Sequence, residues 1–248
     1  MNTLLGIDEP GAYELINPGG RSQLVLVCDH ASNRLPTRLG DLGLAEEHLA
    51  SHIGWDPGAA LLTRSLCARL DTVGLLSNYS RLVIDCNRNP AAADSIPASS
   101  HGLLIPGNAR LHENELQLRR RELFTPYHEA IRQMLNTRAG QPTRMLSIHS
   151  FTPALAGSDR PWPIGVCYRL DLDWAAQWLS ALRAKLSEPV GDNQPYAVEL
   201  NIDYTLPVHC EARGMPGIML EIRQDQLQDE DAVHRWSELI AECWMSMA

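Results

Sequence analysis

The chain has 248 residues, of which 44% are hydrophobic and 21% are charged. This length and composition are typical of a globular protein with a large core, and they exclude a collagen-like repeat, a disordered chain and a small scaffold held by disulfides. Because 30 acidic residues outnumber 21 basic ones, the formal net charge of -9 disfavours nucleic acid as a partner.

The chain lacks the sequence features of a membrane or secreted protein. Its longest uninterrupted apolar run, Leu24 to Cys28, is far too short to cross a membrane. The N-terminus carries Asp8 and Glu9 in place of the basic start and apolar centre of a signal peptide. The 6 cysteines are widely spaced and form no CxxC pair, which favours reduced thiols. We therefore expect a cytoplasmic protein without membrane contact, and the sequence leaves its oligomeric state open.

Short apolar runs alternate along the chain with longer segments of helical period. The predicted strands are 24–28, 73–76, 82–86, 145–149, 164–168 and 218–222, and the predicted helices are 57–70, about 113–136 with a kink or break at Pro126, 173–186 and 231–245. Strands that are apolar throughout are typical of a sheet covered on both faces. We predict a single α/β domain over residues 1–248, a three-layer sandwich whose central mixed, mostly parallel sheet carries helices on both faces. The segments 89–108 and 188–200 are predicted to be lids or binding loops, or else surface excursions.

Two histidines stand at the ends of predicted strands. His30 directly follows the first apolar strand, and His149 ends a later one. Ligands of open α/β sheets bind at the carboxyl ends of strands, where an imidazole can bind a metal through one nitrogen while an acceptor holds the other. His30 taken alone is equally compatible with a core histidine whose ring is satisfied by the backbone.

A catalytic zinc site needs a further protein ligand and leaves one position open for water. Asp56, held just ahead of a predicted helix, is the better candidate, because Asn33 would be a weak neutral ligand. The alternative is that Asp56 is an ordinary helix N-cap. Ser150, next to His149, either donates a hydrogen bond behind the metal ligands or caps a turn.

A third polar cluster ends the predicted strand 82–86. Arg88 can grip a carboxylate with two parallel hydrogen bonds, and Asn87 would add a directional one. The same cluster also fits a structural ion pair of Asp85 with Arg81 or Arg88. The sequence leaves both interpretations open.

Glu221 lies in the middle of the strongly apolar segment 217–223. A buried carboxylate needs a partner, a proton or a polar cavity, so Glu221 is the best candidate for a general base. His209 and Arg213 follow as candidates to contact a carbonyl or a second substrate carboxylate. His209 is equally compatible with a solvated loop.

Five motifs carry these residues in one order along the chain. They are Cys-Asp-His-Ala-Ser-Asn-Arg-Leu-Pro (28–36), Gly-Trp-Asp-Pro-Gly-Ala (54–59), Ser-Arg-Leu-Val-Ile-Asp-Cys-Asn-Arg (80–88), Ile-His-Ser-Phe-Thr-Pro (148–153) and Leu-Glu-Ile-Arg-Gln-Asp (220–225). In this order the chain resembles the N-formylglutamate amidohydrolase family, from about residue 24 to residue 225. The resemblance implies a zinc-dependent hydrolase with the phosphorylase/hydrolase-like fold of carboxypeptidases and aspartoacylases.

The resemblance also implies a metal site. His30 and His149 match the metal-binding histidines of these relatives. Asn33 stands where the relatives have a glutamate ligand, so we expect Asp56 to complete the site for one divalent ion, Zn2+. The aspartate of this motif is itself similar to a recurring element of the formylglutamate amidohydrolases.

The implied reaction is removal of an N-formyl or another small N-acyl group from an acidic amino acid such as N-formylglutamate. By this resemblance residues 85–88 hold the carboxylate of a small anionic substrate, and Glu221 activates water. Arg81 or His209 would steady the developing oxyanion. Arg213 and Ser150 would assist in substrate binding.

Two other interpretations stay open at this point. The first is a metal-free acyl hydrolase with Ser150 or Cys28 as the nucleophile, although the sequence has neither a GxSxG elbow nor a cysteine at an evident helix N-terminus. The second is a non-catalytic binding protein for anionic small molecules, which would use the same arginines without turnover.

Overall fold

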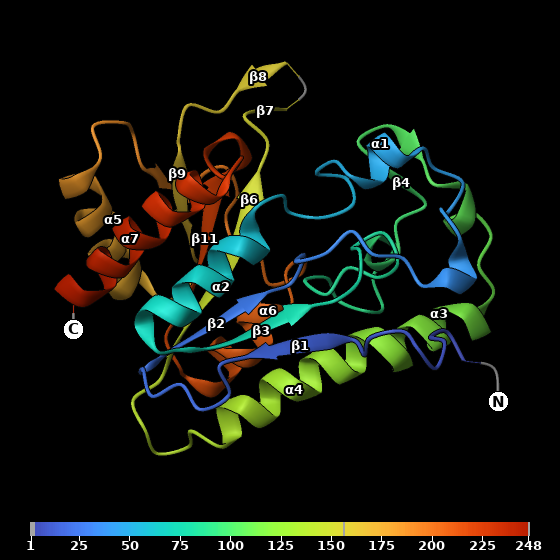
Figure 1. Cartoon of the computed structure of the whole chain (residues 1–248), viewed down its shortest axis with the longest axis horizontal. Coiled ribbons are helices and arrows are strands. Elements are labelled where there is room, and N and C mark those ends of the chain that lie inside the picture. Colours follow the sequence, from blue (N-terminus) through green and yellow to red (C-terminus); the bar gives the residue numbers. More distant parts are fainter. Residues whose placement is uncertain (1–2, 156, 248) are drawn as a thin grey trace.

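The computed structural model describes residues 3–155 and 157–247 (Figure 1). These residues form a seven-stranded sheet in the order β1-β3-β2-β6-β11-β9-β10. The strands are β1 (Tyr13–Ile16), β2 (Leu24–Cys28), β3 (Val73–Ser77), β6 (Arg144–Phe151), β9 (Ile164–Cys167), β10 (Gly191–Asp192) and β11 (Gly217–Arg223). The neighbours β3, β2, β6 and β11 are parallel, whereas β1 pairs antiparallel with β3 and β9 pairs antiparallel with β11. The predicted mixed, mostly parallel sheet is confirmed.

Helices cover both faces of this sheet. Figure 1 shows α2 (Ala59–Leu70), α5 (Leu172–Lys185) and α7 (Glu230–Ser246) together on one side, and α4 (Thr125–Asn136) on the other with the short α6 (Thr205–His209). Successive side chains of a strand point to opposite faces. In β2, Leu24 and Leu26 therefore pack in the first helix layer, and Val25 and Val27 pack in the second. This double burial explains why the strand is apolar throughout, and the three-layer sandwich is confirmed.

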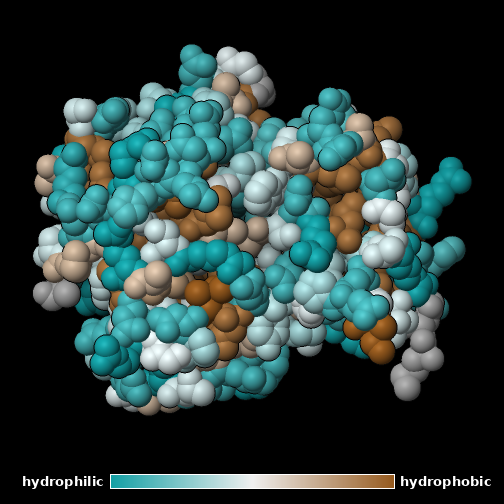
Figure 2. Space-filling view, viewed as in Figure 1, coloured by the Kyte–Doolittle hydropathy of each residue, from teal (hydrophilic) through white to brown (hydrophobic). Residues whose placement is uncertain are grey.

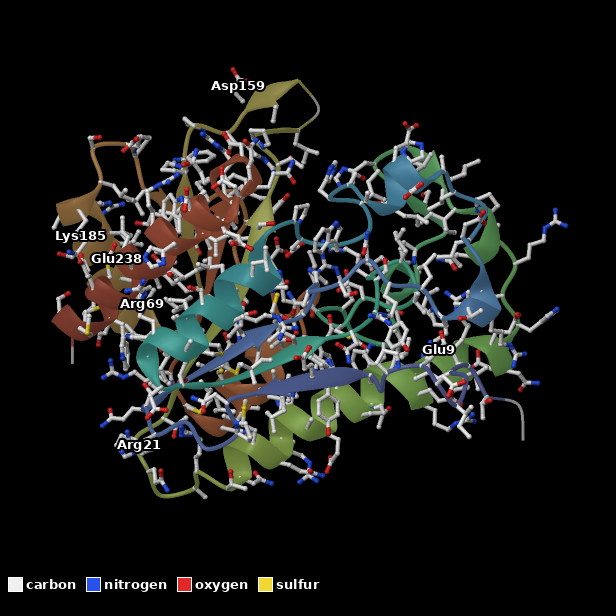
Figure 3. All side chains as sticks on the ribbon, in the orientation of Figure 1. Glu9, Arg21, Arg69, Asp159, Lys185 and Glu238 are labelled. Carbon is white, nitrogen blue, oxygen red and sulfur yellow. The ribbon has the colours of Figure 1, made fainter. Side chains whose placement is uncertain are left out.

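Helices α2 and α7 also contact each other directly. The hydroxyls of Ser65 and Ser237 form a hydrogen bond of 2.8 Å between the two helices. On the outer surface, Arg69 and Glu238 lie 3.9 Å apart at the same contact (Figure 3). Helices α2 and α7 are thus joined by polar contacts as well as by apolar packing.

The remaining elements are short. They are α1 (Glu46–Leu49), α3 (Glu113–Arg119), the pairs β4 (Ser99–Ser100) with β5 (Leu103–Leu104) and β7 (Ala154–Leu155) with β8 (Ser158–Asp159), and the 3-10 turns η1 (Thr37–Leu39), η2 (Ala93–Ser95), η3 (Pro106–Asn108), η5 (Glu211–Arg213) and η6 (Gln224–Gln226). Within the described residues, no helix is both long and apolar enough to cross a membrane.

The long helical region 113–136 is continuous but irregular just before Pro126, where the sequence predicts a kink or break. Helix α3 passes into a π-helical turn, η4 (Arg120–Phe124), before α4 begins at Thr125. Pro126 has no N–H to donate to the carbonyl of Glu122 one turn earlier, so the regular ladder cannot continue through it.

The predicted strand 82–86 is wrong. These residues form buried turns, in which the Val83 N–H donates to the Ser80 carbonyl (2.9 Å) and the Asp85 N–H donates to the Ser95 carbonyl (2.7 Å). Leu82, Val83 and Ile84 are buried, but they pack in satellite clusters beneath segment 89–108 and not in the sheet. An apolar run in a sequence indicates that its residues are buried, but it does not show which element they pack against.

Candidate active site

The main cluster of functional side chains lies at the carboxyl ends of the parallel strands. His30 follows β2, while His149 and Glu221 lie opposite each other in the β6–β11 register. Asp56 comes from the segment before α2, and its N–H donates to the His30 carbonyl (3.0 Å). Four segments that are distant in sequence therefore meet at one edge of the sheet, where ligands of such sheets bind.

His30, Asp56 and His149 form a compact, buried group. One ligand atom from each lies within 4.8 Å of the others. The Asp56 Oδ2 atom is 2.8 Å from His149 Nδ1 and 3.3 Å from His30 Nδ1. Both imidazoles therefore direct the same ring nitrogen at one carboxylate oxygen.

The other nitrogen of each ring faces a second carboxylate. His30 Nε2 is 2.7 Å from Asp85 Oδ1, and His149 Nε2 is 3.2 Å from Asp29 Oδ2. Histidines that bind metals typically donate their free N–H to such an acceptor. Two imidazole nitrogens and one carboxylate are also a ligand set of catalytic zinc sites. The chemistry and arrangement of these donors fit a divalent ion.

Asp56 is not the N-cap of α2. The cap is Gly58, whose φ of 81° lies in the left-handed region that favours glycine. The Asp56 carboxylate instead faces His30 and His149. Burial alone would raise the pKa of Asp56, but these two imidazoles hold it well below its usual range. Asp56 is therefore a charged ligand candidate.

Arg81 links the carboxylates of this group. Its Nη2 atom is 2.8 Å from Asp85 Oδ2, and its Nη1 atom is 3.5 Å from Asp56 Oδ1. The Arg81 side chain is 26% exposed and lines a cavity. The structural ion pair of Asp85 with Arg81, one of the interpretations that the sequence left open, is thus present, and Arg81 also lies in the site.

Glu221 is the buried acid without a partner in this cluster. It is 5% exposed and lines the same cavity, and its Oε2 atom makes no hydrogen bond with any described residue. Burial raises the pKa of Glu221 to about 7, against the opposing effect of His149. A carboxyl group in this state can both accept and donate a proton near neutral pH.

The cavity has a volume of about 580 Å³, which suits a small ligand. In Figure 2 the upper outline of the molecule is hollowed between the part that carries β7 and β8 and the part that carries α1 and β4. Segments 89–108 and 188–200, both predicted as binding loops, contribute to the lining of the cavity. Their lining residues are Asp94, Pro97, Ser99, Ser100 and His101 from the first, and Pro195, Tyr196, Ala197 and Glu199 from the second.

Asn87 and Arg88 reach the cavity but already have protein partners. The Asn87 amide donates to Asp203 Oδ1 (2.9 Å), and its oxygen accepts the N–H groups of Tyr204 (3.1 Å) and Thr205 (3.0 Å). Arg88 lies 3.3 Å from Asp203 and 3.5 Å from Asp94. Asp94 is 63% exposed, so a substrate carboxylate could replace it at Arg88.

Ser150 supports Asp56. Its N–H donates to Asp56 Oδ2 (3.3 Å), and its hydroxyl donates to the Pro57 carbonyl (2.8 Å). Among the described residues, the hydroxyl thus donates to a backbone carbonyl and not to a histidine or a carboxylate. Cys28, the other candidate nucleophile, is fully buried, and burial raises the pKa of its thiol. Neither side chain has the surroundings of an activated nucleophile.

His209 and Arg213 do not line the cavity among the described residues. His209 is buried on α6, where it faces the ring of His128 with a nitrogen-to-nitrogen distance of 2.9 Å. Arg213 donates to the side chain of Asn136 (2.9 Å). His209 of α6 and Arg213 of η5 thus both contact residues of α4.

Sequence reasoning missed two histidines of the cavity. The rings of His52 and His101 lie 5.1 Å apart, and His52 Nε2 is buried without a hydrogen-bond partner among the described residues. These residues come from different loops, and no local motif marks them. Asp29 was part of the first motif but was given no role. Its place directly before His30 was the available signal.

The chain is similar to a known family and to solved structures. The family model described as N-formylglutamate amidohydrolase matches residues 22–227. The chain is 31% identical to gene product Atu2144 from Agrobacterium tumefaciens, with a TM-score of 0.91 over 98% of this chain and 99% of that one. It is 19% identical to N-formylglutamate amidohydrolase from Ralstonia eutropha JMP134, with a TM-score of 0.68 over 96% and 97%, which shows a shared fold. No curated protein sequence matches the chain.

Proposed function

Because the chain belongs to the N-formylglutamate amidohydrolase family and is thus a hydrolase of amide bonds, we propose that it removes an N-formyl or another small N-acyl group from an acidic amino acid such as N-formylglutamate. The observation that carries this proposal is the convergence of His30, Asp56 and His149 beside the unpartnered Glu221 in one cavity. Membership of an enzyme family leaves a non-catalytic binding role without support.

We propose one divalent ion, Zn2+, as the cofactor. His30 and His149 would hold it through Nδ1, and Asp56 through its carboxylate. When bound, such an ion polarises a carbonyl and lowers the pKa of water towards about 7. The proposal is supported by the shared direction of the two Nδ1 atoms and by the acceptors Asp85 and Asp29 behind the rings.

Glu221 acts as the base and then as the acid. Its carboxylate accepts a proton from water as the water oxygen bonds to the acyl carbon. When the C–N bond breaks, Glu221 donates that proton to the departing nitrogen, so a formyl substrate gives formate and a free amino acid. The buried Oε2 atom supports this role, because it has no hydrogen-bond partner among the described residues.

The cations of the cavity bind the negative charges of the substrate. Arg81 is placed to stabilise the oxyanion, since its guanidinium already lies beside the ligand candidate Asp56. Arg88 binds the substrate carboxylate, which takes the place of Asp94. Asn87 holds the backbone of Tyr204 and Thr205 in position. Ser150 holds Asp56, and His209 and Arg213 have no part in this mechanism.

The proposal is tested by metal analysis of the purified protein and by assays on N-formyl and N-acetyl derivatives of glutamate, aspartate, glutamine and leucine. We expect one zinc per chain, loss of activity with a chelator, recovery with Zn2+, and preference for the N-formyl acidic substrates. A protein that hydrolyses none of these compounds after reconstitution with divalent ions would refute the proposed reaction. Full activity in a rigorously metal-free protein would refute the cofactor alone.

A further inference from the structure

We infer that Asp29 is a positioning residue, which fixes the ring of His149 for metal binding. Asp29 is itself held by the helix layer that contains α4 and α6. The inference rests on the metal site proposed above. It assigns a role to a residue that lies at the end of β2 and does not line the cavity.

The Asp29 side chain is completely buried and is surrounded by donors. Its Oδ1 atom accepts hydrogen bonds from the hydroxyls of Tyr127 and Thr205, both at 2.8 Å. Its Oδ2 atom lies 3.2 Å from the Ser147 hydroxyl and 3.2 Å from His149 Nε2. Only an ionised carboxylate can accept from all four groups, so the surroundings select the charged form.

This arrangement determines which nitrogen of His149 faces the ligand group. A proton on Nε2 is held by Asp29, with the Ser147 oxygen 3.0 Å from the same nitrogen. The lone pair of Nδ1 is then directed towards Asp56 Oδ2, 2.8 Å away. A carboxylate behind an imidazole both orients the ring and raises its basicity as a ligand.

Asp29 differs from Asp85, which plays the same part for His30. Asp85 lines the cavity and forms an ion pair with Arg81. Asp29 is enclosed, and its direct partners are three hydroxyls and an imidazole. The charge of Asp29 is therefore little screened by solvent, and among its partners the imidazole of His149 is stabilised most by that charge.

The anchoring of Asp29 comes from the second helix layer. Residues 25, 27 and 29 alternate onto the face covered by α4 and α6, which carry Tyr127 and Thr205. The N–H of Thr205 donates to Asn87, which lines the cavity. The Asp29 carboxylate thus has two separate anchors on this face, one from each helix, although neither helix supplies a metal ligand.

The test compares Zn2+ binding in the full chain and in two variants that remove different parts of this arrangement. Asp29→Asn keeps the shape of the side chain but removes the charge. We expect its Zn2+ dissociation constant, measured by competition with a chromophoric chelator, to rise by about 10- to 100-fold. Tyr127→Phe removes one hydrogen bond to the same carboxylate and leaves the charge, so its dissociation constant should stay close to that of the wild type.

A second measurement separates positioning from a general loss of stability. In the zinc-loaded wild type, the ring nitrogen shifts of His149 should show a metal-bound Nδ1 and a protonated Nε2. A protonated Nδ1 with metal on Nε2 would overturn the inference even if Asp29→Asn failed to fold. In a folded Asp29→Asn protein, the Nε2–H signal should move or exchange faster, while that of His30 stays unchanged.

The outcomes distinguish this inference from the proposed function. A wild type that binds no Zn2+ refutes the metal site, and this role for Asp29 with it. A wild type that binds zinc, together with an Asp29→Asn variant of equal affinity and unchanged His149 shifts, refutes the positioning role alone. Equal losses of affinity in Asp29→Asn and Tyr127→Phe would also count against it, because they would point to packing.

Discussion

At the scale of single residues, the site is a set of buried charges that are paired with one exception. Asp29, Asp56 and Asp85 each face an imidazole, and the desolvation of each carboxylate is offset by hydrogen bonds. Glu221 is equally buried, yet its Oε2 atom has no partner among the described residues. An unpaired buried acid is costly, and such groups concentrate at functional sites.

We predict that Glu221→Gln lowers kcat by about 10²- to 10⁴-fold, because the amide cannot accept or return the proton. Substrate binding should be largely retained, since the shape of the side chain is unchanged. Steady-state kinetics together with direct binding measurements check this. Glu199→Gln is the matched control, because Glu199 is an exposed acid of the same cavity and has no part in the mechanism. A Glu221→Gln enzyme with wild-type kcat would contradict the assignment.

At the scale of elements, the cavity is shaped by loops that lie directly on the sheet. A Cβ atom on Gly165 in β9 would be 1.7 Å from the carbonyl oxygen of Gln194. Only glycine lets segment 188–200 cross β9 this closely, and that crossing brings Tyr196 to the cavity. The Tyr196 ring also lies 4.9 Å from the Arg160 guanidinium, which connects this loop to the β8 end of the neighbouring hairpin.

We predict that Gly165→Ala displaces segment 193–197 and destabilises the protein by about 1–3 kcal/mol, the usual effect of inserting a methyl group into a tight contact. The substrate KM should rise more than kcat falls, because Tyr196 moves while the metal ligands stay in place. Urea unfolding and steady-state kinetics measure both effects. Gly19→Ala is the control, since a Cβ atom there meets nothing within 4 Å. Unchanged KM in Gly165→Ala would show that this loop does not shape the site.

At the scale of the whole molecule, stability is linked to the protons and ions that the folded state binds. His128 and His209 face each other in the buried layer, and His128 Nε2 lies 2.8 Å from the Cys86 carbonyl. Burial lowers the pKa of His128 to about 4, and burial together with His128 lowers the pKa of His209 to about 3. The folded protein therefore keeps both rings neutral at pH values where the unfolded chain protonates them.

We predict that this pair makes the protein less stable as the pH falls from about 6.5 towards 4. In that window the unfolded chain binds more protons than the folded one, and each excess proton costs about 1.4 kcal/mol per pH unit. His209→Gln removes one titrating group, so its stability should decline less steeply over the same range. Urea unfolding at several pH values measures the two slopes. A parallel decline in both proteins would refute the role of His209.

We also predict that Zn2+ stabilises the folded protein, because an ion that binds only the native state adds its binding free energy. Free zinc at 100 times its dissociation constant should raise the unfolding free energy by about 2.7 kcal/mol. Urea unfolding with chelator and with buffered zinc measures the difference. His149→Gln should abolish most of it, and an equal gain in that variant would place the ion elsewhere.

Much of the fold follows from the sequence alone. Apolar runs such as Leu24 to Cys28 predict strands buried on both faces, and Pro126 predicts the irregularity that appears as a π-helical turn between α3 and α4, because these depend on local burial and on one missing donor. The edge strands β1 and β10 escaped prediction, since they are short and, at β1, half-exposed. The side chains offered as metal ligands were also identifiable, because histidines at strand ends share one edge of a parallel sheet.

Other features were decided by the tertiary structure. The apolar segment 82–86 has the sequence of a strand, but the N–H groups of Val83 and Asp85 donate to Ser80 and Ser95 and not to a neighbouring strand. His209 resembles a site residue in the sequence, yet α6 turns it towards His128. The nitrogen that each metal-candidate imidazole directs at Asp56 depends on Asp29 and Asp85 behind the rings. Periodicity encodes how deeply a residue is buried, whereas its partner is selected by contacts between segments that lie far apart in the chain.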